Sequence, residues 1–465
     1  MSYGPIETAD HLDADVSPDQ NTWMLELSPD KQRLFAATRI GLTQTLNSKA
    51  QPIHRWFVPG RLEFLGKHTD YCRGRSIFGA IDRGICFCAS ARSDTRLRML
   101  DVQSGQIAEL DMYSQSGPAQ HDWTLYPATV ARRLASMFPV PIQGADVAFI
   151  SDLPPAAGLS SSSCLIVGFY LALARVNAKV LDAHNRTLAQ DPVALGDFLG
   201  CVESGRAWRE YSGDNGVGTR GGSQDHTAIL CATPNRLTGF DFYESRSLAS
   251  VALPADVTIA IAISGISAHK TGNAGAAYNR VSRRAAACLD VWNKNNHPPG
   301  DSLEAVFRAT ADGGRRIRAA LQQHADGEFS TASLLSRLEQ YDMESHIIIP
   351  AALTALRQEH WQELGRLVDQ SQRLAETCLH NQVPQTQRLA ASARGLGAVA
   401  ASAFGAGFGG AVWALVAKAE ADDFLMRWQD AYAKEFPQVA DHASFFLTRL
   451  GFPATELPMS ASAPD

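Results

Sequence analysis

A turn of small residues between a predicted strand and a predicted apolar helix constrains the fold more than any other segment. The turn runs from Pro154 to Ser163, the strand from Ala145 to Ile150 and the helix from Leu165 to Val176. A helix that is apolar on all sides is normally buried, so the turn must lie against a core. The unpaired N–H groups at the start of such a helix carry partial positive charge and suit a phosphate. A plain serine N-cap is the alternative.

The turn does not have the Walker pattern, because no Gly-Lys-Ser/Thr follows it. A magnesium ion bound there would take its ligands from the serines and from a separate carboxylate.

A second candidate site is a polar turn after a predicted strand. Arg61, Lys67, His68 and Asp70 fall within ten residues of one another. They offer cationic donors and a carboxylate acceptor, as a phosphorylated or polyhydroxylated ligand would require. A solvated surface turn is the alternative interpretation.

Two further glycine-bearing segments are weaker signals. The uncharged loop Gly405 to Gly410 is compatible with tight packing alone. In the segment Gly218 to His226, flexible backbone precedes Asp225, for which a surface Asx turn is the alternative.

Composition excludes several classes of protein. The 465 residues are 45% hydrophobic and 19% charged, which is typical of a soluble globular chain of two to three domains. The net charge of −6, without blocks of like charge, argues against a nucleic-acid or membrane surface. The eight scattered cysteines are interpreted as reduced thiols, and residues 1–20 do not resemble a secretory signal, so we expect a cytoplasmic protein.

The stretch Gly395 to Ala417 carries no charge and is long enough to span a bilayer. Its glycines would break a lipid-exposed helix. We predict a buried loop packed against a strand.

The mixture of predicted strands and helices indicates an α+β protein with two lobes and a ligand cleft between them. We expect an N-terminal extension with one helix over residues 1–50, a first lobe over 51–232, a second lobe over 233–452 and a mobile tail over 453–465. Ser28 and Pro29 predict the start of the first helix. The segment Thr233 to Asp256, with two prolines, is predicted to cross between the lobes. Strands are predicted at Arg55 to Leu65, Ser76 to Ser90, Val257 to Ile263 and Val412 to Val416, and helices at Ala274 to Trp292, Ser302 to His324, Ser330 to Glu344 and Pro350 to Asn381.

Taken together, these motifs resemble the GHMP kinase superfamily, and within it the galactokinases. The run from Gly60 to Tyr71 looks like the galactokinase signature, Pro154 to Ser163 resembles the phosphate loop and Phe404 to Gly410 resembles the third motif. Asp122 to Tyr126 and Tyr278 to Arg280 are also similar to galactokinases. The resemblance extends from about Trp56 to Leu450.

This resemblance implies a two-lobed fold with a ribosomal-protein-S5-like N-terminal lobe, a ferredoxin-like C-terminal lobe and the active site between them. It implies an ATP- and Mg²⁺-dependent kinase that phosphorylates the anomeric hydroxyl of galactose or a related sugar, with sugar and ATP as its small-molecule partners; oligomeric state stays open. Asp225 matches the catalytic base and Arg61 the arginine beside it. The resemblance assigns sugar binding to Lys67, His68, Thr69, Asp70 and Tyr278. It assigns nucleotide binding to Ala156, Ala157, Gly158, Leu159, Ser160, Ser161 and Ser162. The Mg²⁺ ligands would be Ser162 and Glu203.

The chain departs from the galactokinase pattern within the run from Gly60 to Tyr71, which we call the sugar turn. Lys67 stands where galactokinases have a glutamate, and Glu63 replaces the usual asparagine. One interpretation is an exchanged charge pair without functional effect. The other is that Lys67 faces an anionic group, which would make a uronic acid the substrate. A non-catalytic sensor of ATP and sugar is a further alternative.

Smaller departures are Ala156 in place of a glycine, Gln372 in place of a histidine, and about ten extra residues, Arg206 to Gly216, between Glu203 and Asp225. We expect this insertion to enlarge a loop beside the cleft.

Overall fold

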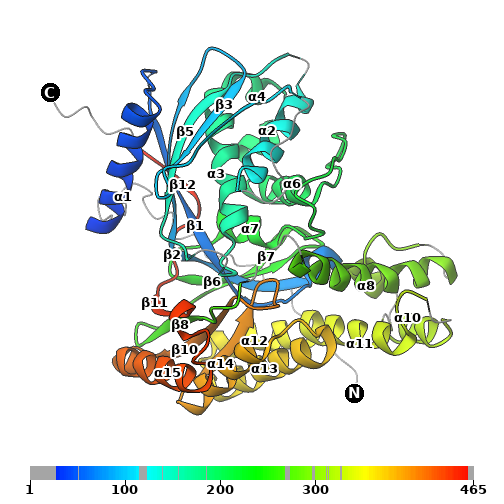
Figure 1. Cartoon of the computed structure of the whole chain (residues 1–465). Helices are drawn as coiled ribbons and strands as arrows, with labels where there is room; N and C mark the ends of the chain where they lie inside the picture. Colours follow the sequence, from blue (N-terminus) through cyan, green and yellow to red (C-terminus); the bar gives the residue numbers. More distant parts are fainter. Residues whose placement is uncertain are drawn as a thin grey trace.

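In this computed structural model the chain folds into two lobes, one above the other in Figure 1. The structure describes residues 28–458, apart from 51, 115–122, 139, 155–156, 185, 268–272, 296–298, 310–311, 313 and 325–326. The α+β architecture with two lobes is as predicted.

The first lobe is built on a sheet of eight described strands. Their order is β12-β1-β2-β5-β3-β4, with β6 pairing to β2 and β7 pairing to β6. All pairs are antiparallel except β3 with β5. The strands are β1 (His54–Leu65), β2 (Arg75–Ala91), β3 (Arg96–Asp101), β4 (Ile107–Asp111), β5 (Ala145–Ser151), β6 (Arg236–Asp241), β7 (Arg246–Ala252) and β12 (Thr455–Leu457).

Helices cover both faces of this sheet (Figure 1). On one face α1 begins at Pro29 as predicted, with the Ser28 side chain accepting a hydrogen bond from the Lys31 N–H, and its Phe35 packs in a cluster with Phe57. On the other face α3 is buried, as its apolar sequence predicts, and it begins at Ser161, four residues before the predicted start. The helices of this lobe are α1 (Pro29–Ile40), α2 (Leu125–Met137), α3 (Ser161–Val176), α4 (Ala178–His184), α5 (Arg186–Gln190), α6 (Pro192–Ser204) and α7 (Gln224–Cys231), with a π-helical turn at Gly41–Thr45.

The second lobe contains a four-stranded antiparallel sheet in the order β11-β8-β10-β9. Its strands are β8 (Val257–Ile263), β9 (Ala400–Phe404), β10 (Ala411–Ala417) and β11 (Ser444–Thr448). The stretch from Gly395 to Ala417 therefore contains two buried strands joined by the glycine loop, and not a loop alone. Within the described residues, no helix is both long and apolar enough to cross a membrane.

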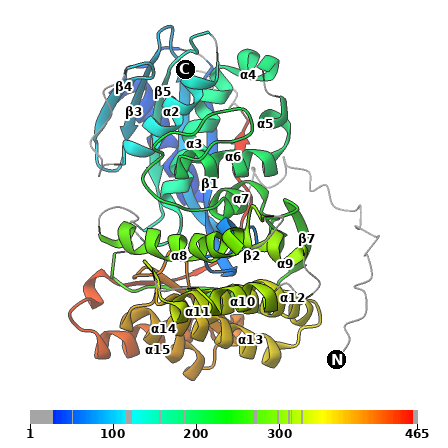
Figure 2. The same cartoon turned by 90° about the vertical axis from the view of Figure 1, so that its right-hand side faces the viewer.

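Two groups of helices complete the second lobe. In one group, α13 (Trp361–Leu374), α14 (Pro384–Gly395) and α15 (Ala421–Glu435) pack on the four-stranded sheet, and α12 (Ile349–Arg357) packs on α13 and on β7 of the first sheet. The other has its own apolar core: α8 (Asn273–Asn295), α9 (Leu303–Ala309), α10 (Gly314–Gln322) and α11 (Thr331–Asp342). Figure 2 shows α8 running across the molecule between the first lobe and α10 and α11. Short helical turns lie at Asp70–Cys72, Met343–Ile348, Ala375–Leu379, Lys418–Glu420 and Ala440–His442.

The predicted lobe boundary at residue 233 is wrong. Residues 236–252 form the hairpin β6–β7, which extends the first sheet through β2. The hairpin was missed because of its two prolines, but Pro234 and Pro254 lie just outside its strands, where proline does not remove a ladder hydrogen bond. The predicted mobile tail is wrong for residues 455–457, which pair with β1 as β12; residues 459–465 lie outside the described part.

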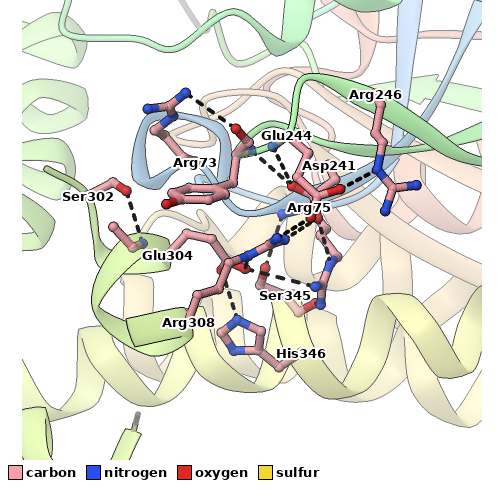
Figure 3. Close-up of polar contacts among 12 residues, drawn as sticks. Arg73, Arg75, Asp241, Glu244, Arg246, Ser302, Glu304, Arg308, Ser345 and His346 are labelled. Atoms are coloured by element: carbon pink, nitrogen blue, oxygen red, sulfur yellow. Dashed lines mark hydrogen bonds and ion pairs between the residues drawn. The ribbon is translucent and has the colours of Figure 1, made fainter. Parts of the chain in front are cut away.

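A network of ions joins the first sheet to the helices of the second lobe (Figure 3). The Glu304 carboxylate accepts hydrogen bonds from Arg308 Nε at 2.8 Å and Tyr341 Oη at 2.6 Å, and lies 2.9 Å from His346 Nε2. Asp241 at the end of β6 accepts from Arg308 Nη2 at 2.5 Å. We call these residues, with Arg75, the Asp241–Glu304 network. It joins the hairpin β6–β7 to α9 and α11.

Candidate active site

A cavity lies where elements of both lobes meet. Its walls come from β1, the turn after β1, the end of α6, the start of α7, helix α8 and the loop between β9 and β10. The lining residues are Arg61, Glu63, His68, Asp70, Tyr71, Gly200, Glu203, Ser204, Gly221, Gly222, Gln224, Asp225, His226, Tyr278, Gly405 and Ala406.

An ion pair between Arg61 of β1 and Asp225 of α7 forms part of the cavity wall. Arg61 Nε donates to Asp225 Oδ1 at 2.7 Å, and Arg61 Nη1 donates to the Gly158 carbonyl at 2.8 Å. The Arg61 side chain is 3% exposed and that of Asp225 15%, so water screens the pair weakly. The pair raises the pKa of Arg61 against the opposing effect of burial. Two residues 164 positions apart are thus held together, with Arg61 also bonded to the turn at Gly158.

The turn from Pro154 to Ser163, which we call the serine turn, contains two residues with left-handed backbone. These are Gly158, with φ of 75°, and Ser160, with φ of 65°. The first is a conformation that favours glycine. The Ser160 Oγ atom is buried and has no hydrogen-bond partner, and Ser161 begins α3. The Ser160 hydroxyl is therefore a buried polar group that a ligand could satisfy. The predicted nucleotide residue Ala156 lies outside the described residues.

The predicted metal ligand Glu203 is buried at the end of α6, beside the start of α3 and α7. Its Oε2 atom accepts a hydrogen bond from Ser163 Oγ at 2.8 Å and lies 3.0 Å from His226 Nε2. Ser163 also lies 3.5 Å from Asp225 Oδ2. The serine in contact with Glu203 is therefore Ser163, one residue after the predicted Ser162.

Three of the five predicted sugar positions line the cavity, namely His68, Asp70 and Tyr278. Asp70 Oδ2 accepts the Gln224 N–H at 3.1 Å, and burial raises the pKa of Asp70. A Cβ on Gly222 would lie 2.3 Å from that same oxygen, so only glycine leaves room for the carboxylate. The Tyr278 ring lies 5.3 Å from the His68 ring.

Both ring nitrogens of His68 are engaged inside the protein. Nε2 lies 3.1 Å from the Ala406 carbonyl and Nδ1 lies 3.0 Å from Tyr71 Oη. A carbonyl only accepts, so Nε2 carries the hydrogen and Nδ1 accepts from the tyrosine. Burial lowers the pKa of His68 to about 3, and the ring is neutral. It joins the sugar turn to the β9–β10 loop.

Lys67 and Thr69 do not line the cavity. The Thr69 hydroxyl lies 2.9 Å from the Gly66 carbonyl and 2.7 Å from the Arg75 carbonyl, and so closes the turn. Lys67 is 1% exposed, and its Nζ donates to Ser371 Oγ at 3.2 Å and to Ser402 Oγ at 2.7 Å. The ammonium therefore faces α13 and β9, and the hypothesis that it selects a uronic acid has no support from its position.

The insertion over residues 206–216 lies beside the cavity and is anchored to the first lobe. Asp214 forms ion pairs with Arg132 and Arg133 of α2 at 3.2 Å each. The Val217 N–H donates to the Glu203 carbonyl at 2.9 Å, which returns the chain to the cavity.

Sequence reasoning missed four contributors to the site. Ser163 was passed over because the family pattern points to the serine before it. Glu63 was treated only as a charge partner, although the two-residue period of a strand places it on the same face as Arg61. Ala406 contributes a carbonyl, which leaves no signal in a sequence. Arg337 donates to the His68 carbonyl at 2.6 Å from α11, and no local pattern connects residues so far apart.

Three family models and several curated proteins match parts of this chain. The galactokinase galactose-binding signature matches residues 43–91, the N-terminal domain of GHMP kinases matches 126–196 and their C-terminal domain matches 352–434. The chain is 36% identical over 109 residues to a galactokinase of Actinobacillus pleuropneumoniae, which covers 23% of this chain and 28% of that protein. It is 27% identical over 381 residues to a galactokinase of Roseiflexus, covering 81% of this chain and 86% of that protein.

A solved structure with a similar fold is Lactococcus lactis galactokinase in complex with galactose. Its TM-score is 0.70 at 21% identity, covering 91% of this chain and 99% of that one. The family models and the relatives agree that the chain is similar to GHMP kinases, and among them to galactokinases.

Proposed function

We propose that this protein is an ATP-dependent sugar 1-kinase that phosphorylates the anomeric hydroxyl of galactose. The observation that carries the proposal is the Arg61 guanidinium, which contacts both Asp225 and the Gly158 carbonyl of the serine turn. This contact puts a carboxylate beside a loop suited to phosphate. The alignments with galactokinases support galactose as the acceptor.

In the proposed reaction the anomeric hydroxyl oxygen attacks the γ-phosphorus of ATP, and the bond from that phosphorus to the β–γ bridging oxygen breaks. Asp225 accepts the hydroxyl proton, which gives sugar 1-phosphate and ADP. Arg61 stabilises the negative charge of Asp225 and lies beside the phosphate turn, where positive charge favours phosphoryl transfer. Residues 157–162 provide the backbone and hydroxyl groups for the phosphates.

The residues present fit Mg²⁺. Glu203 offers a buried carboxylate next to the serines at the start of α3, and Mg²⁺ in kinases usually takes one or two carboxylates together with substrate phosphates. We propose that Glu203 and Ser162 hold the ion, with Ser163 orienting Glu203. When bound, Mg²⁺ would neutralise charge on the phosphates.

We also propose that the protein works in the cytoplasm. Its eight cysteines are free thiols, of which seven are buried, as suits a reducing compartment.

The test is the release of ADP with Mg·ATP and a panel of galactose, galacturonate, glucuronate, arabinose and N-acetylated hexosamines. Turnover should be highest with galactose. The absence of turnover on every sugar would overturn the kinase assignment, and a preference for the acidic sugars would overturn the choice of galactose.

A further inference from the structure

Glu63 is a buried carboxylate in the cavity wall that the proposed mechanism does not use. It lies on β1 two residues after Arg61, is 4% exposed and lines the cavity. Its Oε1 atom has no hydrogen-bond partner. A buried acceptor without a donor costs stability, so such atoms are rare in folded proteins unless a ligand completes them.

The cations nearest to Glu63 are committed elsewhere. Arg61 donates to Asp225 and to the Gly158 carbonyl, and Lys67 donates to Ser371 and Ser402. Both lower the pKa of Glu63 through their charge without bonding to it in the described structure, whereas burial raises that pKa most, with smaller contributions from Asp225 and Asp70, to about 7. The described residues thus supply positive charge near Glu63 but no hydrogen-bond donor to its Oε1 atom.

The cavity around Glu63 suits a ligand rich in hydroxyl groups. Its wall carries the carboxylates of Glu63, Asp70, Glu203 and Asp225, against one guanidinium. An additional carboxylate on the ligand would be repelled there, whereas a hydroxyl can donate to an acceptor. A neutral polyol, and not an acid, is therefore the ligand class that completes this wall.

We infer that Glu63 is a specificity-determining residue that accepts a hydrogen bond from a hydroxyl of the acceptor sugar other than the one that is phosphorylated. This inference rests on the proposed function, since it assigns the orphaned oxygen to the same substrate. Galactokinases have asparagine at this position, so the contact would distinguish this chain from the pattern it resembles.

The experiment compares the wild-type protein with Glu63→Gln, using galactose and its 2-, 3-, 4- and 6-deoxy derivatives as probes. Sugar binding is measured by calorimetry and turnover by ADP release. In the wild-type protein one deoxy sugar should lose about tenfold or more in affinity, because a hydrogen bond to a charged acceptor is lost. In Glu63→Gln, galactose itself should weaken by a smaller factor, because the neutral amide oxygen accepts a weaker hydrogen bond than a carboxylate, and removal of that one hydroxyl should have a smaller effect than in the wild-type protein.

The matched control is Glu304→Gln, which alters a glutamate that is equally buried but is bonded within the Asp241–Glu304 network. This variant should keep the wild-type pattern across the deoxy sugars. If Glu63→Gln also keeps that pattern, the inference is overturned, because water or packing would then satisfy the carboxylate.

The failure of the proposed function has a different signature. If the wild-type protein binds galactose without releasing ADP, the kinase assignment fails, and the deoxy series still tests Glu63 through binding alone. If the wild-type protein binds none of the probes, both the proposed substrate and this inference are overturned.

Discussion

Glu63 and Glu304 are both buried glutamates near the turn that follows β1, and their surroundings differ. Glu304 accepts hydrogen bonds from Arg308 and Tyr341 and lies against His346, and its pKa is held at about 2 against the effect of burial (Figure 3). Glu63 has an oxygen without a donor, and its pKa is raised to about 7. The same side chain at the same depth thus stabilises one region and destabilises another.

The difference separates two uses of a buried charge. A fully paired network contributes stability and orients the elements that it joins, whereas an incomplete set of partners marks a place where a ligand binds. Gln224, which also lines the cavity, has a buried Nε2 atom without a hydrogen-bond partner. The following predictions test this distinction.

The largest effect is expected for Asp225→Asn. The amide keeps an oxygen that can accept from Arg61 Nε, so the fold should persist, but it cannot accept the hydroxyl proton. Turnover on galactose should fall about a thousandfold, measured by ADP release, with ATP affinity measured separately. Loss of ATP binding would contradict the role assigned to Asp225.

Glu304→Gln should cost about 3 kcal/mol of unfolding free energy, because an amide NH₂ group would then meet donors that now converge on a carboxylate. Urea unfolding followed by circular dichroism measures the loss. The KM for galactose should stay within about twofold of wild type, since the network lies outside the cavity. An unchanged urea midpoint would show that the paired network adds little stability.

Glu63→Gln should stabilise the ligand-free protein in a pH-dependent way. The folded-state pKa of about 7 lies above the ordinary value of 4.5, so ionisation of Glu63 opposes folding. This penalty is absent below about pH 4.5, grows as pH rises to 7 and is complete above it. The variant should therefore gain about 2 kcal/mol over wild type at about pH 8 and almost nothing at about pH 5. Thermal melts at the two pH values measure this, and a loss of stability at pH 8 would mean that Glu63 is paired.

His346→Gln should give the smallest effect, a loss of stability that is larger at low pH than at high pH. Glu304 and Asp342 raise the pKa of His346 above 6.5, although its burial opposes them. The charged ring thus stabilises the fold fully below pH 6.5, and this contribution is lost as pH rises through the folded-state pKa. The variant should lose about 1 kcal/mol more at about pH 6 than at about pH 9. An equal loss at both values, measured by urea unfolding, would assign the whole effect to packing against Phe307.

Much of the fold follows from local pattern. The strand 257–263, the α1 start at Pro29 and the burial of α3 each match the prediction, because hydrophobic period and N-cap chemistry act over a few residues. The hairpin β6–β7 and the strand β12 were not predicted, because they are stabilised by pairing with β2 and β1, which are distant in sequence. The helix predicted over 350–381 is divided into α12 and α13, and Glu359 between them has left-handed backbone with φ of 55°.

The amino-acid sequence by itself determined which chemical groups this protein carries, namely a serine turn before a buried helix, an arginine and an aspartate in separate motifs, and a glutamate and a lysine that depart from the galactokinase pattern. Tertiary structure decided where those groups point. It turned Lys67 away from the cavity and Glu63 into its wall, and it selected Ser163 as the partner of Glu203. The physical reason is that charge and propensity belong to single residues, whereas the partners of a buried charge are brought to it by the fold, from 40 residues away for Glu203 and Ser163 and from 335 for Lys67 and Ser402.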